Sequence, residues 1–161
     1  MTSTTKGMPE QSITDSPNET QKVAAEFVLQ LARAEHGTRG TATIIALEGD
    51  LGAGKTVFTK GVAAALGVKT AVTSPTFVIQ KRYDLPEGAH WKRLIHIDAY
   101  RLGGEDELRT IGWDTIATDP NNLVIIEWPQ QVEAGVPQRT HRVVFEEVDE
   151  ETRRLTFEMA W

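Results

Sequence analysis

The sequence has no cysteine among its 161 residues, which excludes disulfide bonds, thiolate metal sites and catalysis by cysteine. It has no apolar run near the roughly 20 residues that a membrane span requires. Its N-terminal segment lacks the apolar stretch of a secretory signal, and its four histidines lack the spacing of a metalloprotease site. These absences predict a cytoplasmic protein that does not interact with membranes.

The sequence also has fewer basic than acidic residues. The chain has 17 Lys and Arg against 23 Asp and Glu, which gives a formal net charge of −6. Its basic pairs, such as Lys81-Arg82 and Lys92-Arg93, are scattered among acids. A protein that binds nucleic acid by itself usually carries a basic face. Autonomous binding of nucleic acid is therefore disfavoured.

The length of the chain suits one domain. Residues 1–15 are polar and rich in Ser and Thr, so we expect a disordered tail there. Residues 16–161 are expected to form the single folded domain. Its first helix begins at Ser16, a capping residue, with Pro17 at the first helical position and Glu19 completing a capping box.

The apolar pattern after this helix predicts alternating strands and helices. Strands are expected within residues 41–49, 73–84, 92–102 and 121–129, helices within 55–67 and 104–118 with a break near Gly112, and a hairpin within 140–159 at the edge of the sheet. This order favours an α/β fold of the P-loop NTPase class. Its central sheet would be mainly parallel, with flanking antiparallel strands and a C-terminal hairpin.

The stretch "LEGDLGAGKT", residues 47–56, contains the phosphate-loop pattern of Gly49, four free positions, Gly54, Lys55 and Thr56. Its glycines allow backbone N–H groups to point at phosphate oxygens. Lys55 would supply a cation for the β- and γ-phosphates, and the Thr56 hydroxyl would bind Mg²⁺. The expected nucleotide contacts in this region are Asp50, Leu51, Gly52, Ala53, Gly54, Lys55, Thr56 and Val57.

Two acids follow apolar strands. Glu127 closes "LVIIE" and Asp98 closes "LIHID". Ligands of open parallel sheets bind at the carboxyl ends of strands. Either acid could therefore bind the metal or orient the attacking water, and an ordinary solvated acid is the alternative for each.

Other residues near these acids have a functional and a structural interpretation. Trp128 could cover a nucleotide or pack in the core. His96 alternates with Asp98 on one strand face, where a structural role is expected for a lone histidine. The stretch "SPTF", residues 74–77, has the position of a GTPase switch segment with its Thr at Thr76, or is a proline turn that opens a strand.

Five motifs occur together and in order, namely "GDLGAGKT", "SPTF", "HIDAYRL", "LRTIG" and "IIEWP". In this combination the chain resembles the TsaE family, also called YjeE, of small bacterial P-loop ATPases in tRNA threonylcarbamoyladenosine biosynthesis. The resemblance covers about residues 16–160. It implies binding of ATP and Mg²⁺, slow ATP hydrolysis, and action with the partner proteins TsaD and TsaB on the adenosine next to the tRNA anticodon. TsaD would perform the transfer, the ATP cycle would reset the complex, and tRNA would be contacted only through the complex.

The resemblance also implies roles for single residues. By motif match, the catalytic residues would be Lys55, Asp98 and Glu127, the metal ligands Thr56 and Glu127, and further nucleotide contacts Thr76 and Trp128. The segment around residues 16–20 would approach the base. Val57 departs from the pattern, because many members of the family have a second Thr there.

Two other functions stay open from the sequence. The first is a small-molecule kinase that uses the same phosphate loop, with Asp98 as base for a substrate hydroxyl. Such kinases usually add an arginine-bearing lid, and only Arg139 and Arg142 lie between the last motif and the acidic turn of the hairpin. The second is a nucleotide-binding switch module that recruits partners without catalysis. Single-turnover hydrolysis with and without partners separates these functions.

Overall fold

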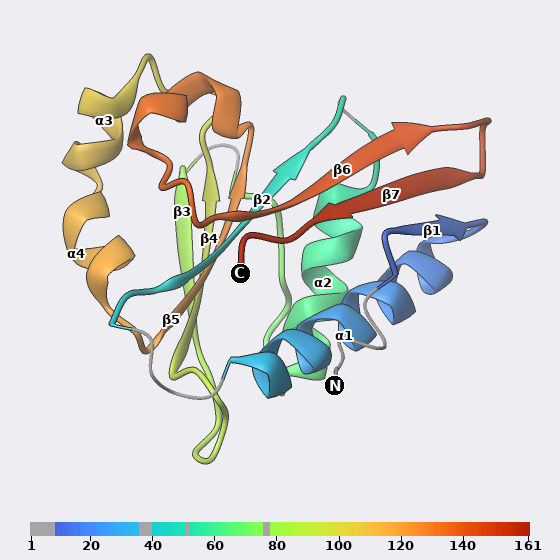
Figure 1. Cartoon of the computed structure of the whole chain (residues 1–161), viewed down its shortest axis with the longest axis horizontal. Helices are drawn as coiled ribbons and strands as arrows, with labels where there is room; N and C mark the ends of the chain where they lie inside the picture. Colours follow the sequence, from blue (N-terminus) through green and yellow to red (C-terminus); the bar gives the residue numbers. More distant parts are fainter. Residues whose placement is uncertain (1–8, 36–39, 51, 76–77) are drawn as a thin grey trace.

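The computed structural model describes residues 9–35, 40–50, 52–75 and 78–161. Within these ranges seven strands form one sheet, with helices packed on both of its faces (Figure 1). The strands are β1 (Gln11–Thr14), β2 (Thr43–Glu48), β3 (Gln80–Asp84), β4 (Arg93–Asp98), β5 (Asn122–Glu127), β6 (His141–Glu147) and β7 (Arg153–Glu158). The helices are α1 (Pro17–Ala34), α2 (Lys55–Ala65), α3 (Glu105–Thr110) and α4 (Trp113–Thr118), and a 3₁₀ helix η1 (Pro129–Gly135) follows β5.

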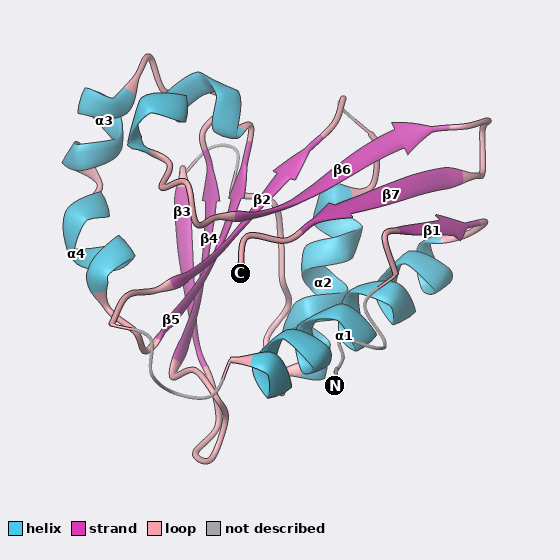
Figure 2. Cartoon of the chain, in the orientation of Figure 1, coloured by secondary structure: helices cyan, strands magenta, loops and turns pink. Residues whose placement is uncertain are grey.

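The strands lie in the order β1-β7-β6-β2-β5-β4-β3. The four central strands β6, β2, β5 and β4 run parallel, whereas β3, β7 and β1 each join the sheet through an antiparallel pair. The predicted α/β architecture is confirmed, with parallel strands at the centre, antiparallel strands on both flanks and a C-terminal hairpin of β6 and β7 (Figure 2). Because only the centre is parallel, the sheet as a whole is mixed.

The N-terminal segment differs from the prediction. Residues 11–14 were predicted to belong to a disordered tail, but they form β1, which pairs with the outer edge of β7. The Thr14 hydroxyl, which is buried, also lies 2.7 Å from the Thr20 hydroxyl in α1. A four-residue polar segment has too weak a pattern to be recognised alone, because its backbone partners lie at the other end of the chain. The hairpin is therefore not at the sheet edge as predicted, since β1 covers it.

The start of α1 follows the capping signals with one change. The Ser16 hydroxyl accepts a hydrogen bond from the Glu19 N–H at 3.2 Å, as predicted for the N-cap. The Glu19 carboxylate, however, accepts from the Asp15 N–H at 2.6 Å instead of the Ser16 N–H expected in a capping box. This bond fixes the turn that leads from β1 into α1.

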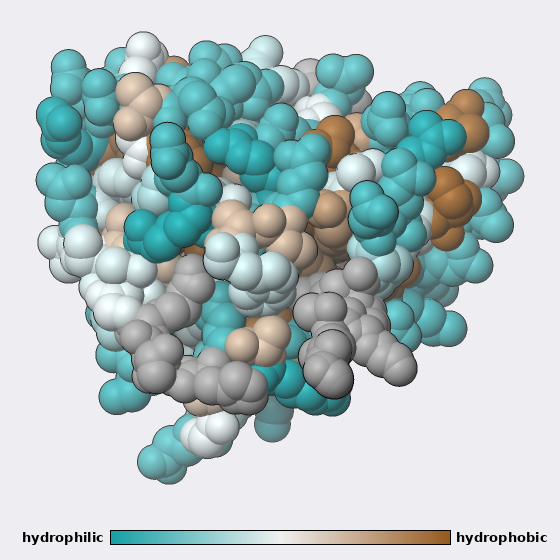
Figure 3. Space-filling model, viewed as in Figure 1, coloured by the Kyte–Doolittle hydropathy of each residue, from teal (hydrophilic) through white to brown (hydrophobic). Residues whose placement is uncertain are grey.

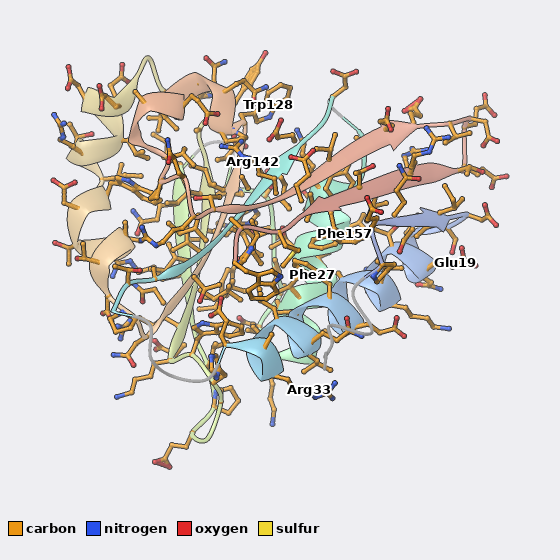
Figure 4. All side chains as sticks on the ribbon, in the orientation of Figure 1. Glu19, Phe27, Arg33, Trp128, Arg142 and Phe157 are labelled. Carbon is orange, nitrogen blue, oxygen red and sulfur yellow. The ribbon has the colours of Figure 1, made fainter. Side chains whose placement is uncertain are left out.

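Each face of the sheet has its own apolar core, because successive strand residues point to opposite sides. One core joins β2, β4, β5, β6 and β7 to α1 and α2, and the other joins β2, β4 and β5 to α3, α4 and η1. In the first core, Phe27 of α1 and Phe157 of β7 face one another with ring centroids 5.1 Å apart (Figure 4). Strands β2, β4 and β5 are covered on both faces, which explains their continuous apolar runs.

The surface is mostly hydrophilic on the face shown in Figure 3. Hydrophobic atoms gather there at the end of the molecule where the hairpin and β1 lie, and Ile13 and Val148 are exposed large hydrophobic residues of these segments. In the described part of the chain, no helix is long and apolar enough to cross a membrane.

Helices α1 and α2 approach closely at Gly61. A Cβ atom at this position would lie 2.5 Å from the Gln21 carbonyl oxygen, 2.7 Å from the Gln21 Cα and 2.9 Å from the Ala24 Cβ. Two of these atoms belong to the backbone and cannot rotate away. The close contact holds α2, and with it the phosphate loop at its start, against α1.

Gly61→Ala is therefore expected to lower the free energy of unfolding by about 1–3 kcal/mol through overpacking, although alanine has the higher helix propensity. Thermal unfolding measures this as a decrease of about 2–4 °C per kcal/mol. Gly40→Ala is the control, because a Cβ there meets no atom within 4 Å. Equal or higher stability of the Gly61 variant would contradict the close packing.

Candidate nucleotide-binding site

The loop between β2 and α2 is shaped by glycine. Gly52 and Gly54 have φ angles of 80° and 105°, in a region that residues with a Cβ rarely adopt. The Ala53 N–H donates to the Asp50 carbonyl at 3.1 Å, which closes a turn before the helix. Helix α2 then begins with the Phe58 N–H donating to the Gly54 carbonyl at 2.9 Å. The positive end of the α2 dipole is thereby directed at the loop.

Lys55, the first residue of α2, is 5 % exposed. Its ammonium group donates to the Gly49 carbonyl at 2.6 Å and lies 3.8 Å from the centroid of the Trp128 ring. Both contacts lie on the side of β2 and β5, at the carboxyl ends of these strands. Burial lowers the Lys55 pKa from its ordinary value of 10.5, and the charges of Glu127, Asp98 and Asp50 oppose that decrease.

The two predicted acids stand next to each other. Asp98 ends β4, Glu127 ends β5, and the parallel register pairs them directly. Both are buried, at 5 % and 4 % exposure. One Asp98 carboxylate oxygen accepts from the Tyr100 N–H at 2.9 Å. The register thus brings two carboxylates to the edge of the sheet where the cation of Lys55 also lies.

His96, one pleat before Asp98 on β4, reaches the second acid. Its Nε2 lies 2.6 Å from Glu127 Oε2, and the His96 side chain is fully buried. This geometry is consistent with the prediction that His96 and Asp98 lie on the same face of their strand. His96, for which the sequence predicts a structural role, thus also contacts a candidate metal ligand.

Trp128 directly follows Glu127 and has a left-handed backbone, with φ 58° and ψ 50°. This conformation is unfavourable for a bulky residue, and such strain is concentrated at functional sites. The Trp128 ring packs edge-on against Tyr100, with centroids 5.0 Å apart, and its face covers the Lys55 ammonium. Trp128 lies at the end of the sheet beside η1 (Figure 4). Of the two alternatives left open by the sequence, the Trp128 side chain therefore borders the candidate site and is not part of either apolar core.

These side chains surround a cleft of about 240 Å³. Its lining residues are Gly52, Gly54, Lys55, Thr56, Val57, Ser74, Asp98, Glu127 and Trp128. A cation, a hydroxyl and two carboxylates therefore converge beside a glycine-rich loop, which is the arrangement that binds a phosphate chain with its metal ion.

A second cleft, of about 280 Å³, adjoins the first and shares Gly52, Gly54 and Val57 with it. Its other walls are the start of α1 and the turn of the β6–β7 hairpin, through Asp15, Ser16, Pro17, Thr20, Glu150, Glu151 and Arg153. The residues around 16–20, expected to approach a nucleotide base, thus lie beside the phosphate loop.

Hydrogen bonds join the hairpin turn to the other two walls of the second cleft, which are the glycine-rich loop and the segment before α1. The Arg153 guanidinium donates to the Gly52 carbonyl at 3.4 Å, and the Thr152 hydroxyl donates to the Asp15 carboxylate at 3.2 Å. Arg153 also donates to carbonyls within the turn, including that of Asp149 at 3.0 Å. These hydrogen bonds hold the loop, the start of α1 and the hairpin turn around one cleft, although the three segments are far apart in the sequence.

The residues fit a magnesium ion only together with phosphate. In the described ranges, no group of three or more His, Asp or Glu side chains could hold a metal ion by itself. Mg²⁺ in nucleotide sites takes one or two protein ligands, because phosphate oxygens and water complete its octahedron. Thr56 and Glu127, which line the same cleft, supply such a partial set.

A family model described as "Threonylcarbamoyl adenosine biosynthesis protein TsaE" matches residues 14–155. The chain belongs to the TsaE family. This confirms the resemblance inferred from the five motifs.

Several TsaE relatives match most of the chain. The tRNA threonylcarbamoyladenosine biosynthesis protein TsaE of Bacillus subtilis is 37% identical over 147 residues, covering 89% of this chain and 82% of that protein. The protein of the same name from Aquifex aeolicus is 36% identical over 121 residues, covering 74% and 76%. A crystal structure of Bacillus subtilis YdiB superposes with a TM-score of 0.66 at 30% sequence identity, covering 94% of this chain and 85% of that chain.

Most of the residues predicted from the TsaE motifs line the first cleft. Ala53 is buried and Asp50 is exposed, and neither is among the lining residues. Leu51 and Thr76 lie outside the described residues. The structure adds Ser74 to the first cleft and Arg153 to the second. No local signal in the sequence connects the acid-rich hairpin turn to the loop between β2 and α2.

Lys55→Met tests the electrostatic balance of the site. Burial lowers the Lys55 pKa, so a charged ammonium group costs free energy in the folded state. This cost is present at neutral pH and disappears as the pH rises through the folded pKa toward the ordinary value of 10.5, because the group then loses its proton. The variant should therefore have a higher free energy of unfolding than wild type at pH 7, and the difference should shrink at alkaline pH. Denaturant unfolding between pH 7 and the alkaline range measures both effects.

Lys60→Met, on the exposed side of the same helix, is the control and should show neither effect. A Lys55 variant that is less stable than wild type at pH 7 would mean that the attraction of the neighbouring acids outweighs the burial of the ammonium group.

Proposed function

We propose that this protein has a P-loop NTPase fold, binds ATP with Mg²⁺ and hydrolyses it slowly, as an accessory protein of tRNA threonylcarbamoyladenosine modification that acts with TsaD and TsaB. The observation that supports this most strongly is the single cleft in which Lys55 and Thr56 face Asp98 and Glu127 beside a glycine-rich loop. Membership in the TsaE family supports the pathway.

The first cleft would hold the phosphates. The loop N–H groups and the α2 N-terminus would face the phosphate oxygens. Lys55 would exchange its Gly49 carbonyl and the face of Trp128 for the β- and γ-phosphates, which give its charge a better partner than a neutral carbonyl. Thr56 and Glu127 would hold the metal ion, which neutralises the charge that develops on the phosphates during hydrolysis. Asp98 would act as the second catalytic acid and orient the attacking water.

The second cleft would hold the nucleoside end of ATP. It is continuous with the first through Gly52, Gly54 and Val57, so one extended ligand can occupy both. The α1 N-terminus and the hairpin turn would lie on either side of the base. Arg153 would keep the hairpin wall against the loop.

A small-molecule kinase is less well supported. The two arginines that could have formed a lid bond instead to other residues of the folded domain. Arg142 is paired with Glu48 at 2.8 Å and Glu133 at 2.7 Å, and Arg139 donates to the Ala117 carbonyl at 3.4 Å. Neither residue lines either cleft.

Among the described residues, no arginine lines the first cleft, which suits an ATPase completed by its partners, as GTPases are completed by a trans-acting arginine. The net charge of −6 suits contact with tRNA through the complex instead of directly.

Phosphate release tests the partner-dependent function. The isolated protein should hydrolyse ATP slowly, and TsaD and TsaB together should raise the rate by about tenfold or more, a small part of what a trans-acting arginine gives. The rate is measured for the protein alone, with each partner and with both. Glu127→Ala is the matched control and should remove the Mg²⁺-dependent part in every mixture. Equal rates in all four mixtures, together with a phosphorylated metabolite in a substrate screen, would favour the kinase.

Arg153→Ala tests the nucleoside end of the site. Loss of the hairpin wall should weaken ADP binding by about tenfold, the size of one charge-assisted hydrogen bond. Tripolyphosphate, which occupies only the first cleft, should bind as it does to wild type. Isothermal titration calorimetry measures both ligands. Arg154→Ala is the control, because Arg154 pairs with Glu146 at 3.4 Å and lines neither cleft. Equal loss of both ligands, or no loss of either, would argue against a base in the second cleft.

A further inference from the structure

His96 forms a buried pair with Glu127 directly beneath the first cleft. The Nε2–Oε2 distance is 2.6 Å, and the two side chains are 0 % and 5 % exposed. His96 is flanked along its strand face by Leu94 and Asp98, so it stands between the apolar core and the site. A carboxylate buried this deeply is costly unless hydrogen bonds hold it, and His96 supplies one of them.

The hydrogen on the His96 ring follows from its surroundings. The ring nitrogen Nδ1 is buried and has no hydrogen-bond partner in the described part of the structure. An N–H at Nδ1 would be a buried donor without an acceptor, which is more costly than an unused lone pair. The hydrogen is therefore best placed on Nε2, where it is donated to Glu127 Oε2. This bond occupies one carboxylate oxygen, while Glu127 itself lines the cleft.

A second buried histidine–glutamate pair shows what a structural pair looks like in this fold. His141 Nε2 lies 3.5 Å from Glu35 Oε2 at the opposite end of the sheet, where β6 and β2 begin. The His141 Nδ1 accepts from the Ala160 N–H at 3.0 Å, and the other Glu35 oxygen accepts from the Thr43 hydroxyl at 2.6 Å. Each histidine thus leaves one buried ring nitrogen without a hydrogen bond, but not the same one. In the structural pair it is Nε2, which faces Glu35, whereas His96 uses Nε2 to contact Glu127 at 2.6 Å and leaves Nδ1 unpaired.

We infer that His96 is a positioning residue for Glu127, the proposed metal ligand: its Nε2–H holds Oε2 and leaves the other carboxylate oxygen for the metal ion that the cleft would bind. The inference rests on the proposed binding of Mg²⁺ with nucleotide. Partners behind a metal ligand commonly change metal affinity by about 10–100-fold when they are removed. The effect of His96 should therefore appear in the Mg²⁺ dependence of nucleotide binding rather than in binding without metal.

The test compares two amide replacements. Gln can place its side-chain N–H where Nε2 stands, whereas Asn is too short to reach Glu127. ADP affinity is measured by the change in tryptophan emission, in EDTA and over a series of Mg²⁺ concentrations. His96→Asn should raise the half-saturating Mg²⁺ concentration by about tenfold or more and leave the affinity in EDTA unchanged. His96→Gln should keep most of the wild-type Mg²⁺ dependence.

His141→Asn is the matched control, because it removes a buried histidine from the structural pair. Its Mg²⁺ dependence should equal that of wild type, whatever its melting temperature. In a Glu127→Ala background, His96→Asn should have no further effect on the Mg²⁺ dependence, because the ligand that it positions is gone.

Three results would overturn the inference. The first is wild-type Mg²⁺ dependence in folded His96→Asn. The second is an equal change in the His96 and His141 variants. The third is loss of folding in both His96→Asn and the volume-conserving His96→Leu, which would make the role structural. If wild-type protein binds ADP without any influence of Mg²⁺, both this inference and the proposed metal site are wrong. If wild type shows the influence and only the His96 result fails, the proposed function stands without it.

Discussion

Lys55 is a buried cation at the carboxyl end of parallel strands, and the arrangement of the site follows from its charge. Burial opposes the ammonium group, while Glu127, Asp98 and Asp50 attract it. Without phosphate, its hydrogen-bond acceptor in the structure is the neutral Gly49 carbonyl, with the face of Trp128 beside it. A cation held in this way is poorly compensated compared with one bonded to an anion. The proposed anionic ligand would compensate this charge, which costs the folded protein some stability, as expected for functional groups.

The order of the strands explains why the loop has two different sides. Strand β2 lies between β5 and β6, so the loop that follows it has the acids of β4 and β5 on one side and the hairpin on the other. The first side supplies charge through Asp98 and Glu127. The hairpin side supplies a wall of the second cleft, because Arg153 donates a hydrogen bond to the Gly52 carbonyl of the loop. The two clefts share loop residues for the same reason, and the ligand proposed for them has a charged end and a neutral end.

The site also contains features that a fold under selection for stability alone would lack. Trp128 has a left-handed backbone, and His96 Nε2 lies 2.6 Å from the carboxylate of Glu127. In the His141–Glu35 pair at the other end of the sheet the two atoms are 3.5 Å apart, and each residue bonds to a neighbouring segment instead. This contrast between two pairs of the same chemistry agrees with the inference that His96 positions Glu127.

The sequence by itself determined most of the elements and most of the residues that line the first cleft. Continuous apolar runs identify central strands, since strands covered on both faces must be apolar throughout. The loop pattern and the acids at strand ends are local signals, so Lys55, Thr56, Asp98 and Glu127 could be named in advance. The break at Gly112 and the cap at Ser16 are equally local and were also correct.

Only the tertiary structure decided which distant segments meet. Strand β1 is a polar segment whose pairing partner, β7, lies at the other end of the chain, so no local pattern marks it. The same holds for Arg153 at Gly52 and for His96 at Glu127, because strand register, and not sequence spacing, brings their atoms together. Hydrogen bonds across a sheet depend on which strands are neighbours, and that order is set by the packing of α1 and α2 on one face and of α3 and α4 on the other.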